Sequence, residues 1–482
     1  MPVARLKSAG RSAAEVWSLA WPTVITMLSY TVMQFVDSIM VAQLGPLELA
    51  AQGNGGVWTW TITAFLIGII SLVNTFVSQS IGAGDSANAS RYAWAGIWFG
   101  LVAWLVVLLP YAFLVLPWAF GLMGHEPRLV ELELAYGQWL MVGGCFTLVA
   151  KAMSNFFFAV QRPKIVAVAA IVGNIVNLAL NYALIYGEAG LPSLGLPGVP
   201  GVQARGVEGA AIATVIGVAV ECIIPAAVFF GPAMAKAYAT RRNWRLDAGA
   251  IKDLVKVGWP ASIQFGNEMF CWSIFMTVLV GVFGTVHLAA GWAVLRYMHV
   301  SFMPAVAFSI ATTSLVGRSI GAGNPELAVR YTRTALWMSI LYMGAWGALM
   351  LIFREPMIRV FTDAANIDPA VSDEVVSIGA KIMIAAAIFQ AFDAVGIVYT
   401  GALRGAGDTL WPGLMTIALS WSLIVGGGWA MVHYQPDYQS VGPWLGATAY
   451  IILLGGVMAW RFERGPWKSR PLVRHAGSGG HG

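Results

Sequence analysis

Charged residues are scarce in this chain: Asp, Glu, Lys and Arg together make up 11% of its 482 residues. A soluble protein carries about 25% charged residues, whereas 58% of this chain is hydrophobic and its mean hydropathy is +0.71. This balance excludes an ordinary soluble domain. The alternating ten-residue segments of a membrane barrel are also lacking. Helices are the other structure that satisfies its own backbone in lipid.

Cysteine and histidine are also rare, with three and six copies. Cys145, Cys222 and Cys271 lie in apolar stretches and show neither a metal-binding spacing nor a paired framework. Two glycine-rich SIGAG segments lack the Lys-Ser/Thr of a phosphate-binding loop. We expect their glycines to end one helix and Asp85 or Asn324 to cap the next. No cofactor is therefore expected.

What the chain does contain is one sequence written twice. Residues 77–94 read VSQSIGAGDSANASRYAW and residues 316–333 read VGRSIGAGNPELAVRYTR, with nine of eighteen positions identical. Trp21-Pro22 and Trp259-Pro260 repeat at almost the same offset. Internal duplication of a hydrophobic chain is typical of secondary transporters, in which two related bundles rock around a site between them.

Apolar stretches long enough to cross a hydrocarbon core of roughly 30 Å as helices recur along the chain. We predict twelve spans, near residues 16–44, 55–81, 93–117, 133–160, 165–187, 208–231, 251–282, 288–317, 330–353, 374–403, 410–433 and 443–461. The predicted fold is therefore an all-α integral membrane protein. Its predicted parts are a first half of six spans (1–235), a linker (236–250), a second half of six spans (251–463) and a tail (464–482).

Lysine and arginine are unevenly distributed among the predicted loops. If both termini face the cytoplasm, the cytoplasmic ends and loops hold 21 of the 28 Lys and Arg residues, and the opposite loops hold four. The other three, Lys151, Arg296 and Lys381, lie within spans, where we expect ion pairing or extension to the membrane surface. This bias predicts cytoplasmic termini. The net charge of +5 therefore reflects topology and not nucleic-acid binding.

Acids within the spans are the most informative residues. There are four: Asp37, Glu221, Glu268 and Asp393. A carboxylate at membrane depth costs several kcal/mol on most scales, so it normally faces a cavity or a partner. Glu221 lies nearer a helix end, before Pro225, and is expected to pair or to extend to the surface.

Asp37 belongs to a polar face of the first predicted span. Tyr30, Gln34 and Asp37 share that face because they lie four and then three residues apart. The fifth and sixth spans add further polar groups: Asn174, Asn177, Asn181 and Thr214. Carboxylate, amide and hydroxyl oxygens together suit a hard cation such as Na⁺. A polar clamp between membrane helices is the alternative, and the sequence leaves both open.

The second half contributes Glu268, with Gln264 one helical turn before it, and Asp393. The repeat places Met276 opposite Asp37 and Tyr30 opposite Glu268. The two halves thus carry acids at positions that are not equivalent. A purely structural role would more readily be duplicated, so we interpret Glu268 and Asp393 as functional.

Six segments carry a resemblance to a known family: VDSIMVAQLG, VSQSIGAGD, NLALNY, GAAIATVIG, VGRSIGAGNPELA and YTGALRGAGDT. Together they resemble the multidrug and toxic compound extrusion (MATE) family of cation-coupled antiporters, in its bacterial NorM-like branch. The resemblance covers essentially the whole chain. It implies two six-helix lobes in a V, an N-lobe (1–235) and a C-lobe (251–463), around a central cavity that opens alternately to either side of the membrane.

The resemblance also implies roles for individual residues. In the N-lobe, the site for Na⁺ or a proton would consist of Asp37, Asn177, Asn181 and Thr214. In the C-lobe, Glu268 and Asp393 would bind a cation, a proton or the substrate. Tyr30, Gln34, Asn174 and Gln264 would support these sites. The implied protein is a monomer of the bacterial cytoplasmic membrane that exports amphipathic organic cations or other toxic compounds.

Two other functions remain as alternatives. A lipid-linked precursor flippase of the same superfamily would prefer a strongly basic cavity for pyrophosphate, whereas this chain has three cations and four acids within its spans. A membrane-embedded prenyl-transferring enzyme would need paired acidic metal motifs in its loops, and the acids of residues 363–374 do not supply an ordered set. We therefore expect a transporter and not an enzyme.

Overall fold

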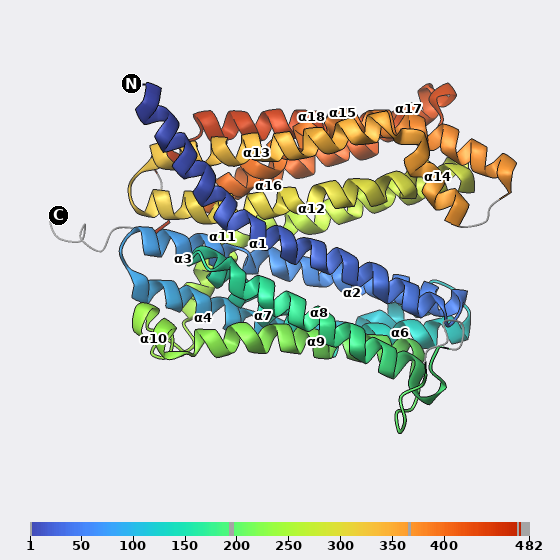
Figure 1. Cartoon of the computed structure of the whole chain (residues 1–482), viewed down its shortest axis with the longest axis horizontal. Helices are drawn as coiled ribbons and strands as arrows, with labels where there is room; N and C mark the ends of the chain where they lie inside the picture. The colour runs from blue at the N-terminus through green and yellow to red at the C-terminus, as the bar shows by residue number, and fades with distance from the viewer. Residues whose placement is uncertain (1, 192–196, 365–367, 470–471, 474–482) are drawn as a thin grey trace. The chain divides into compact units, whose positions relative to one another are not determined.

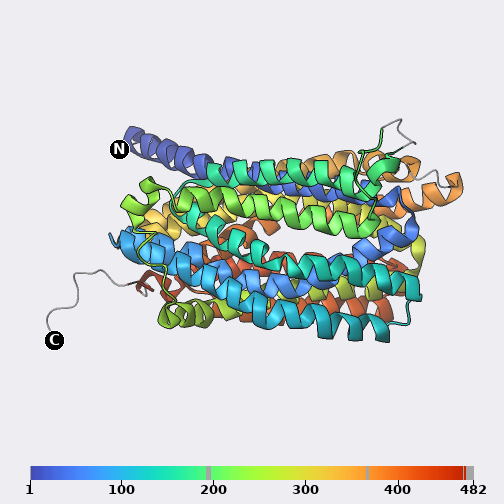
Figure 2. The same cartoon turned by 90° about the horizontal axis from the view of Figure 1, so that it is seen from below.

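The computed structural model describes residues 2–191, 197–364, 368–469 and 472–473, which form helices joined by turns and short loops (Figure 1). Among these residues, eleven helices are long and apolar enough to cross a membrane, and one further bent pair makes up to twelve. The all-α membrane fold is therefore confirmed. Figure 2 shows the same helices from a second direction.

The first half contains the helices that correspond to the first six predicted spans. They are α1 (Pro2–Ala42), α2 (Pro46–Ile70) with α3 (Leu72–Gly82), α4 (Ser86–Ala103) extended through η1 (Trp104–Leu108) and η2 (Tyr111–Val115) into α5 (Leu116–Leu122), α6 (Pro127–Val142) with α7 (Gly144–Ala159), α8 (Pro163–Tyr186) and α9 (Gly206–Phe229). The pair α6 and α7 is bent by 45° at the residue that joins them, Gly143.

The second half contains the remaining six predicted spans and one short connecting helix. Its elements are α11 (Ala248–Ile274) with η5 (Phe275–Val280) and η6 (Gly281–Phe283), α12 (Thr285–Gly321), α13 (Pro325–Ile352), α14 (Arg354–Ala364), α15 (Pro369–Ala406), α16 (Leu410–Leu419) with η7 (Ser420–Gly427) and α17 (Gly428–Tyr434), and α18 (Val441–Arg464). The connecting helix α14 and the linker helix α10 (Pro232–Tyr238) were not predicted.

The two SIGAG segments form the turns that the sequence predicts. Asp85 Oδ1 accepts a hydrogen bond from the Asn88 amide at 3.0 Å, and Asn324 Oδ1 accepts one from the Leu327 amide at the same distance. Before each cap, a glycine takes a left-handed backbone conformation, with φ of +82° at Gly84 and +70° at Gly323. Glycine adopts this conformation without the strain that a Cβ would add. These segments are therefore helix turns.

The helices pack as two units whose limits differ from the ends of the sequence halves. The unit here called the N-unit contains Trp21–Ser262, and the C-unit contains Met1–Ala20 and Ile263–Arg474. Each limit lies inside a continuous helix, α1 or α11, beside one of the two Trp-Pro pairs. The lobe ranges 1–235 and 251–463 stay a prediction about the duplicated sequence.

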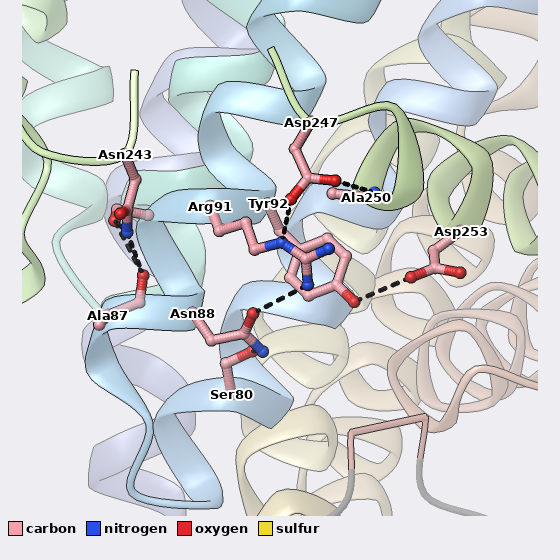
Figure 3. A network of polar contacts seen from close by, with 10 residues as sticks. Ser80, Ala87, Asn88, Arg91, Tyr92, Asn243, Asp247, Ala250 and Asp253 are labelled. Carbon is pink, nitrogen blue, oxygen red and sulfur yellow. Dashed lines mark hydrogen bonds and ion pairs between the residues drawn. The ribbon is translucent and has the colours of Figure 1, made fainter. Parts of the chain in front are cut away.

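Close packing explains why the start of α11 belongs to the N-unit. A Cβ on Gly68 of α2 would lie 2.4 Å from Ser262 Cα, so the two backbones meet where glycine alone fits. Ser262 Oγ donates to the Phe65 carbonyl at 2.5 Å. Tyr92 of α4 donates to Asp253 Oδ2 at 3.2 Å (Figure 3). Hydrogen bonds and backbone contacts thus fix this segment on α2 and α4.

The start of α1 is fixed in the C-unit in a corresponding way. Val16, Leu19 and Ala20 are buried in a cluster with residues of α12, α13 and α15. The Tyr331 hydroxyl donates to the Glu15 carboxylate. The repeat places Tyr331 opposite Tyr92, and the Trp-Pro offset places Glu15 opposite Asp253. The two units therefore hold the start of the other half's first span by the same tyrosine–carboxylate contact.

The linker before α11 is anchored to α4 by an ion pair. Arg91 Nε donates to Asp247 Oδ2 at 2.5 Å, and Asp247 Oδ1 accepts from the Ala250 amide at 2.9 Å (Figure 3). The hydrogen bond from Arg91, followed by that from the Ala250 amide, lowers the pKa of Asp247 to about 2. Because the unfolded pKa is about 4, this stabilisation is complete at neutral pH and is lost as pH falls through about 2.

Two substitutions of Asp247 separate the ion pair from the helix cap. Asp247→Asn removes the charge but can still cap α11, so we expect it to cost less than about 1 kcal/mol for a pair this exposed. Asp247→Ala also removes the cap, which adds about 1 kcal/mol. The measurement is the rate of trypsin cleavage at the linker arginines of the purified protein. We expect Asp247→Ala to be cleaved faster than Asp247→Asn, and equal rates would show that the cap contributes nothing.

Candidate functional site

The predicted N-lobe residues come together between α1, α8 and α9 of the N-unit. Asn181 Nδ2 donates to Asp37 Oδ1 at 2.5 Å and to Asn177 Oδ1 at 3.2 Å. Asn177 Nδ2 in turn lies 3.4 Å from Thr214 Oγ1, which donates to the Ala210 carbonyl. Asp37, Asn177 and Asn181 are buried, at 8%, 1% and 0% exposed. One carboxylate, two amides and one hydroxyl thus form a continuous polar group.

One oxygen of this group has no hydrogen-bond donor. Asn181 Oδ1 is buried and unpartnered among the described residues, although its Nδ2 makes two hydrogen bonds. A buried carbonyl oxygen without a donor is unusual, and it suits a bound cation. The oxygens of the carboxylate, the amides and the hydroxyl are the ligand types that Na⁺ would take. A proton on Asp37 is the other way to neutralise the same buried carboxyl.

Close packing holds these side chains in place. A Cβ on Gly217 of α9 would lie 2.8 Å from Asn177 Cβ, so α8 and α9 meet directly beside the polar group. One helical turn from Asp37 and Thr214, an apolar cluster borders one end of the site; it contains Val41, Tyr136, Ile185, Tyr186, Val207, Ala210 and Ala211. The polar group is therefore rigidly built on helices.

The residues predicted to support Asp37 take other partners. The Tyr30 hydroxyl donates to the Glu221 carboxylate, and Asn174 Nδ2 donates to Ser29 Oγ. The side chain of Gln34 is exposed. These residues share the predicted helix faces, but they lie two turns away from the polar group or, like Gln34, are exposed.

Glu221 pairs within the N-unit and does not extend to the membrane surface. It is 6% exposed, and Lys151 Nζ of α7 lies 3.9 Å from its Oε1. The other two cations of the spans, Arg296 and Lys381, are exposed. Of the three, Lys151 is therefore the one placed against an acid inside a helix bundle. For both residues the sequence allowed ion pairing or extension to the membrane surface, and the structure shows the ion pair.

In the C-unit, Glu268 of α11 accepts a hydrogen bond from the Tyr450 hydroxyl of α18 at 3.0 Å. The carboxyl of Asp393, on α15, lies within electrostatic range of both Glu268 and Tyr450. Arg404, also on α15, acts on Glu268 from its position over the Phe265 ring. The structure thus brings the two predicted acids of this half into one cluster.

Gln264 contacts a different part of the C-unit. Its Nε2 donates to Thr416 Oγ1 of α16 at 3.1 Å, and one turn later Asn267 Nδ2 donates to Ser420 Oγ at 2.8 Å. These bonds join α11 to α16 and η7. Gln264 therefore joins the helix that carries Glu268 to α16.

Sequence reasoning missed two polar partners. Tyr450 lies in the apolar stretch TAYIILLGG, and no local pattern distinguishes it from a packing tyrosine. Glu133, at the first residue of a predicted span, is fully buried and bonds to Asn54 and His125. Its position at the end of a predicted span suggested a solvated side chain, because acids at span ends are normally solvated. The sequence therefore did not indicate its burial. No cluster of three or more His, Cys, Asp or Glu able to hold a metal occurs among the described residues.

Comparison with known proteins gives consistent matches over most of the chain. The family model MatE matches residues 22–183 and 264–426. "Probable multidrug resistance protein NorM" of Pseudomonas syringae pv. tomato is 28% identical over 479 residues, which cover 95% of this chain and 96% of the relative.

Two solved structures share the fold. A MOP superfamily transporter from Pyrococcus furiosus superposes with a TM-score of 0.82 at 21% identity and covers 94% of this chain and 95% of its own. A multidrug resistance MATE family transporter, solved in an outward-facing conformation, gives a TM-score of 0.80 at 22% identity, with 94% and 96% covered.

Proposed function

The chain belongs to the MatE family, and from this premise we propose that it is a multidrug efflux transporter that exchanges amphipathic organic cations for Na⁺ or H⁺ by alternating access. It acts as a monomer in the bacterial cytoplasmic membrane, with both termini in the cytoplasm. The uneven distribution of Lys and Arg supports this orientation. The multidrug resistance name of the NorM relative, whose length the chain covers almost completely, supports the substrate class.

One observation carries the coupling part of the proposal: a buried carboxylate in contact with an amide that has an unpartnered oxygen. Asp37 and Asn181 Oδ1 together provide a negative charge and a free acceptor away from water. Na⁺ at this position would be held by Asp37 with Asn177, Asn181 and Thr214, and a proton would be held by Asp37 itself. In the C-unit, Glu268 and Asp393 bind the cation or the organic substrate.

Exchange follows if cation and substrate favour different conformations. A ligand shifts a two-state equilibrium only by the difference between its affinities for the two states. A cation that enters from outside and neutralises Asp37 must therefore bind one helix arrangement more tightly and weaken the affinity for the substrate. The direct Asn181–Asp37 hydrogen bond couples charge on α1 to the position of α8.

The test is efflux of ethidium or a fluoroquinolone from cells, or its uptake into inverted vesicles, under one imposed gradient at a time. We expect a Na⁺ gradient at fixed pH, or a proton gradient without Na⁺, to drive efflux. Empty-vector membranes at matched total protein are the control. If neither gradient drives efflux, the drug–cation exchange is wrong and the lipid-linked precursor flippase becomes the better reading.

A further inference from the structure

The N-unit buries a second acid that already has a cation beside it. Glu221 of α9 accepts a hydrogen bond from the Tyr30 hydroxyl of α1. Lys151 Nζ of α7 lies 3.9 Å from Glu221 Oε1, 3.3 Å from the Tyr30 hydroxyl and 4.5 Å from the centroid of the Tyr30 ring. Three helices thus place an ammonium group between a carboxylate and the face of an aromatic ring.

The C-unit contains the same acid–tyrosine pair with the residue types exchanged. The offset between the two Trp-Pro pairs places Tyr30 opposite Glu268. Tyr30 bonds from the first span of its half to a glutamate on the sixth span. Glu268, on the first span of the second half, accepts from Tyr450 on the sixth. A glutamate–tyrosine pair therefore joins the first and sixth spans in both halves.

The fourth span of each half adds one charged residue to this pair, and the two added charges differ in sign. In the first half, α7 supplies Lys151; in the second, α15 supplies Asp393. Arg404 also acts on Glu268 in the second half. With every group ionised, Lys151 balances Glu221, whereas the two C-unit acids exceed the arginine by one negative charge. The first half thus has its own cation at a position where the second half has an additional acid.

The contacts of Lys151 are long for a permanent ion pair. Charge-assisted N–H···O bonds are normally about 2.7–2.9 Å, whereas Lys151 Nζ is 3.9 Å from the carboxylate oxygen. Its side chain is 27% exposed, and that of Glu221 is 7% exposed. A cation over a tyrosine ring beside a carboxylate is also the arrangement by which proteins recognise ammonium ligands. Lys151 therefore has the geometry of a weakly held ligand.

We propose that Tyr30 and Glu221 form a recognition site for the ammonium group of amine-bearing substrates, which Lys151 occupies when no substrate is bound. An incoming amine displaces the lysine and takes the carboxylate and the ring face. Lys151 thus acts as a tethered competitor that sets the affinity, and it neutralises the buried Glu221 between transport cycles. This inference rests on the proposed function, since it takes the substrate to be an organic cation.

The test compares two substitutions that should change substrate affinity in opposite directions. Removing a competitor should tighten binding, and removing the acid that binds the ligand should weaken it. Binding of norfloxacin, which carries a piperazine ammonium, is measured by equilibrium dialysis on the purified full-length protein in lipid nanodiscs. We expect Lys151→Met to tighten binding by about fivefold, because the competitor is gone. We expect Glu221→Gln to weaken it by about tenfold, because a charged hydrogen-bond acceptor is lost. A structural ion pair would instead make both changes act in the same direction.

Three controls make the result specific. Lys381→Met removes another lysine of the spans, which is exposed in the C-unit, and should leave binding unchanged. N-acetylnorfloxacin lacks the ammonium charge, so its binding should change in neither variant. Tyr30→Leu removes the ring face and should weaken norfloxacin binding, which provides a second test if Glu221→Gln does not fold.

The outcomes separate this inference from the proposed function. If gradient-driven efflux occurs in the wild type but Lys151→Met weakens norfloxacin binding or leaves it unchanged, the recognition site is wrong and the exchange function stands. If the binding of N-acetylnorfloxacin changes in the two variants as that of norfloxacin does, the site does not recognise the ammonium group. If the wild type neither binds norfloxacin nor transports drug, both proposals fail together.

Discussion

Replacing Asp37 by asparagine is expected to abolish cation-driven efflux while the protein stays folded in the membrane. Asparagine has nearly the same shape, and its oxygen can still accept from Asn181, so the contact between α1 and α8 is retained. It cannot carry the charge that attracts Na⁺ or the proton that a carboxyl exchanges. Loss of a buried charge interaction worth about 3 kcal/mol corresponds to a decrease of about 100-fold in cation affinity.

The measurement is ethidium efflux driven by an imposed gradient, at matched expression and with membrane insertion checked. Asp85→Asn is the matched control, because it makes the same chemical change at a helix cap where asparagine serves equally well. Efflux that keeps its dependence on the cation in Asp37→Asn would remove the N-unit polar group from the coupling mechanism.

Glu268→Gln is expected to weaken drug binding and to raise the cation concentration needed for half-maximal efflux, each by about tenfold. Glutamine retains an oxygen that can accept from Tyr450, so the link between α11 and α18 persists while one of two neighbouring negative charges is lost. A tenfold change corresponds to about 1.4 kcal/mol, which is close to the lower limit for a hydrogen bond to a charged group.

Tyr450→Phe distinguishes charge from position in this cluster. It removes the hydroxyl that orients Glu268 but leaves the carboxylate, so its effect should be smaller than that of Glu268→Gln and should fall mainly on drug affinity. Drug binding and cation response that are both unchanged in Glu268→Gln would exclude this acid from the mechanism.

Much of the fold follows from the sequence because the membrane imposes strict limits on it. The apolar stretches had to be helices of a certain length, and the caps at Asp85 and Asn324 depend only on neighbouring residues. The polar helix faces that carry Asp37 and Asn181 also follow, whereas their meeting in one site is what the family resemblance implies. These features depend on local periodicity, which a single sequence reveals.

The remaining partners depend on which helix faces which, and periodicity does not give that information. Tyr30 lies on the same face as Asp37 but two turns away, where it meets Glu221 and not the predicted site. Tyr450 reaches Glu268 from a helix 182 positions further along the chain. The limits of the packing units were equally hidden, because α1 and α11 continue through them without a break.

The position of those limits bears on the ancestry and assembly of the chain. Each sequence half sends the start of its first helix, held by Glu15 or Asp253, into the unit formed mainly by the other half. A single ancestral half would have lacked this segment unless a second copy provided it. The arrangement is that of an arm exchange, in which each of two related parts completes the other. Two polypeptides separated within the linker would consequently have to be synthesised together to complete each other.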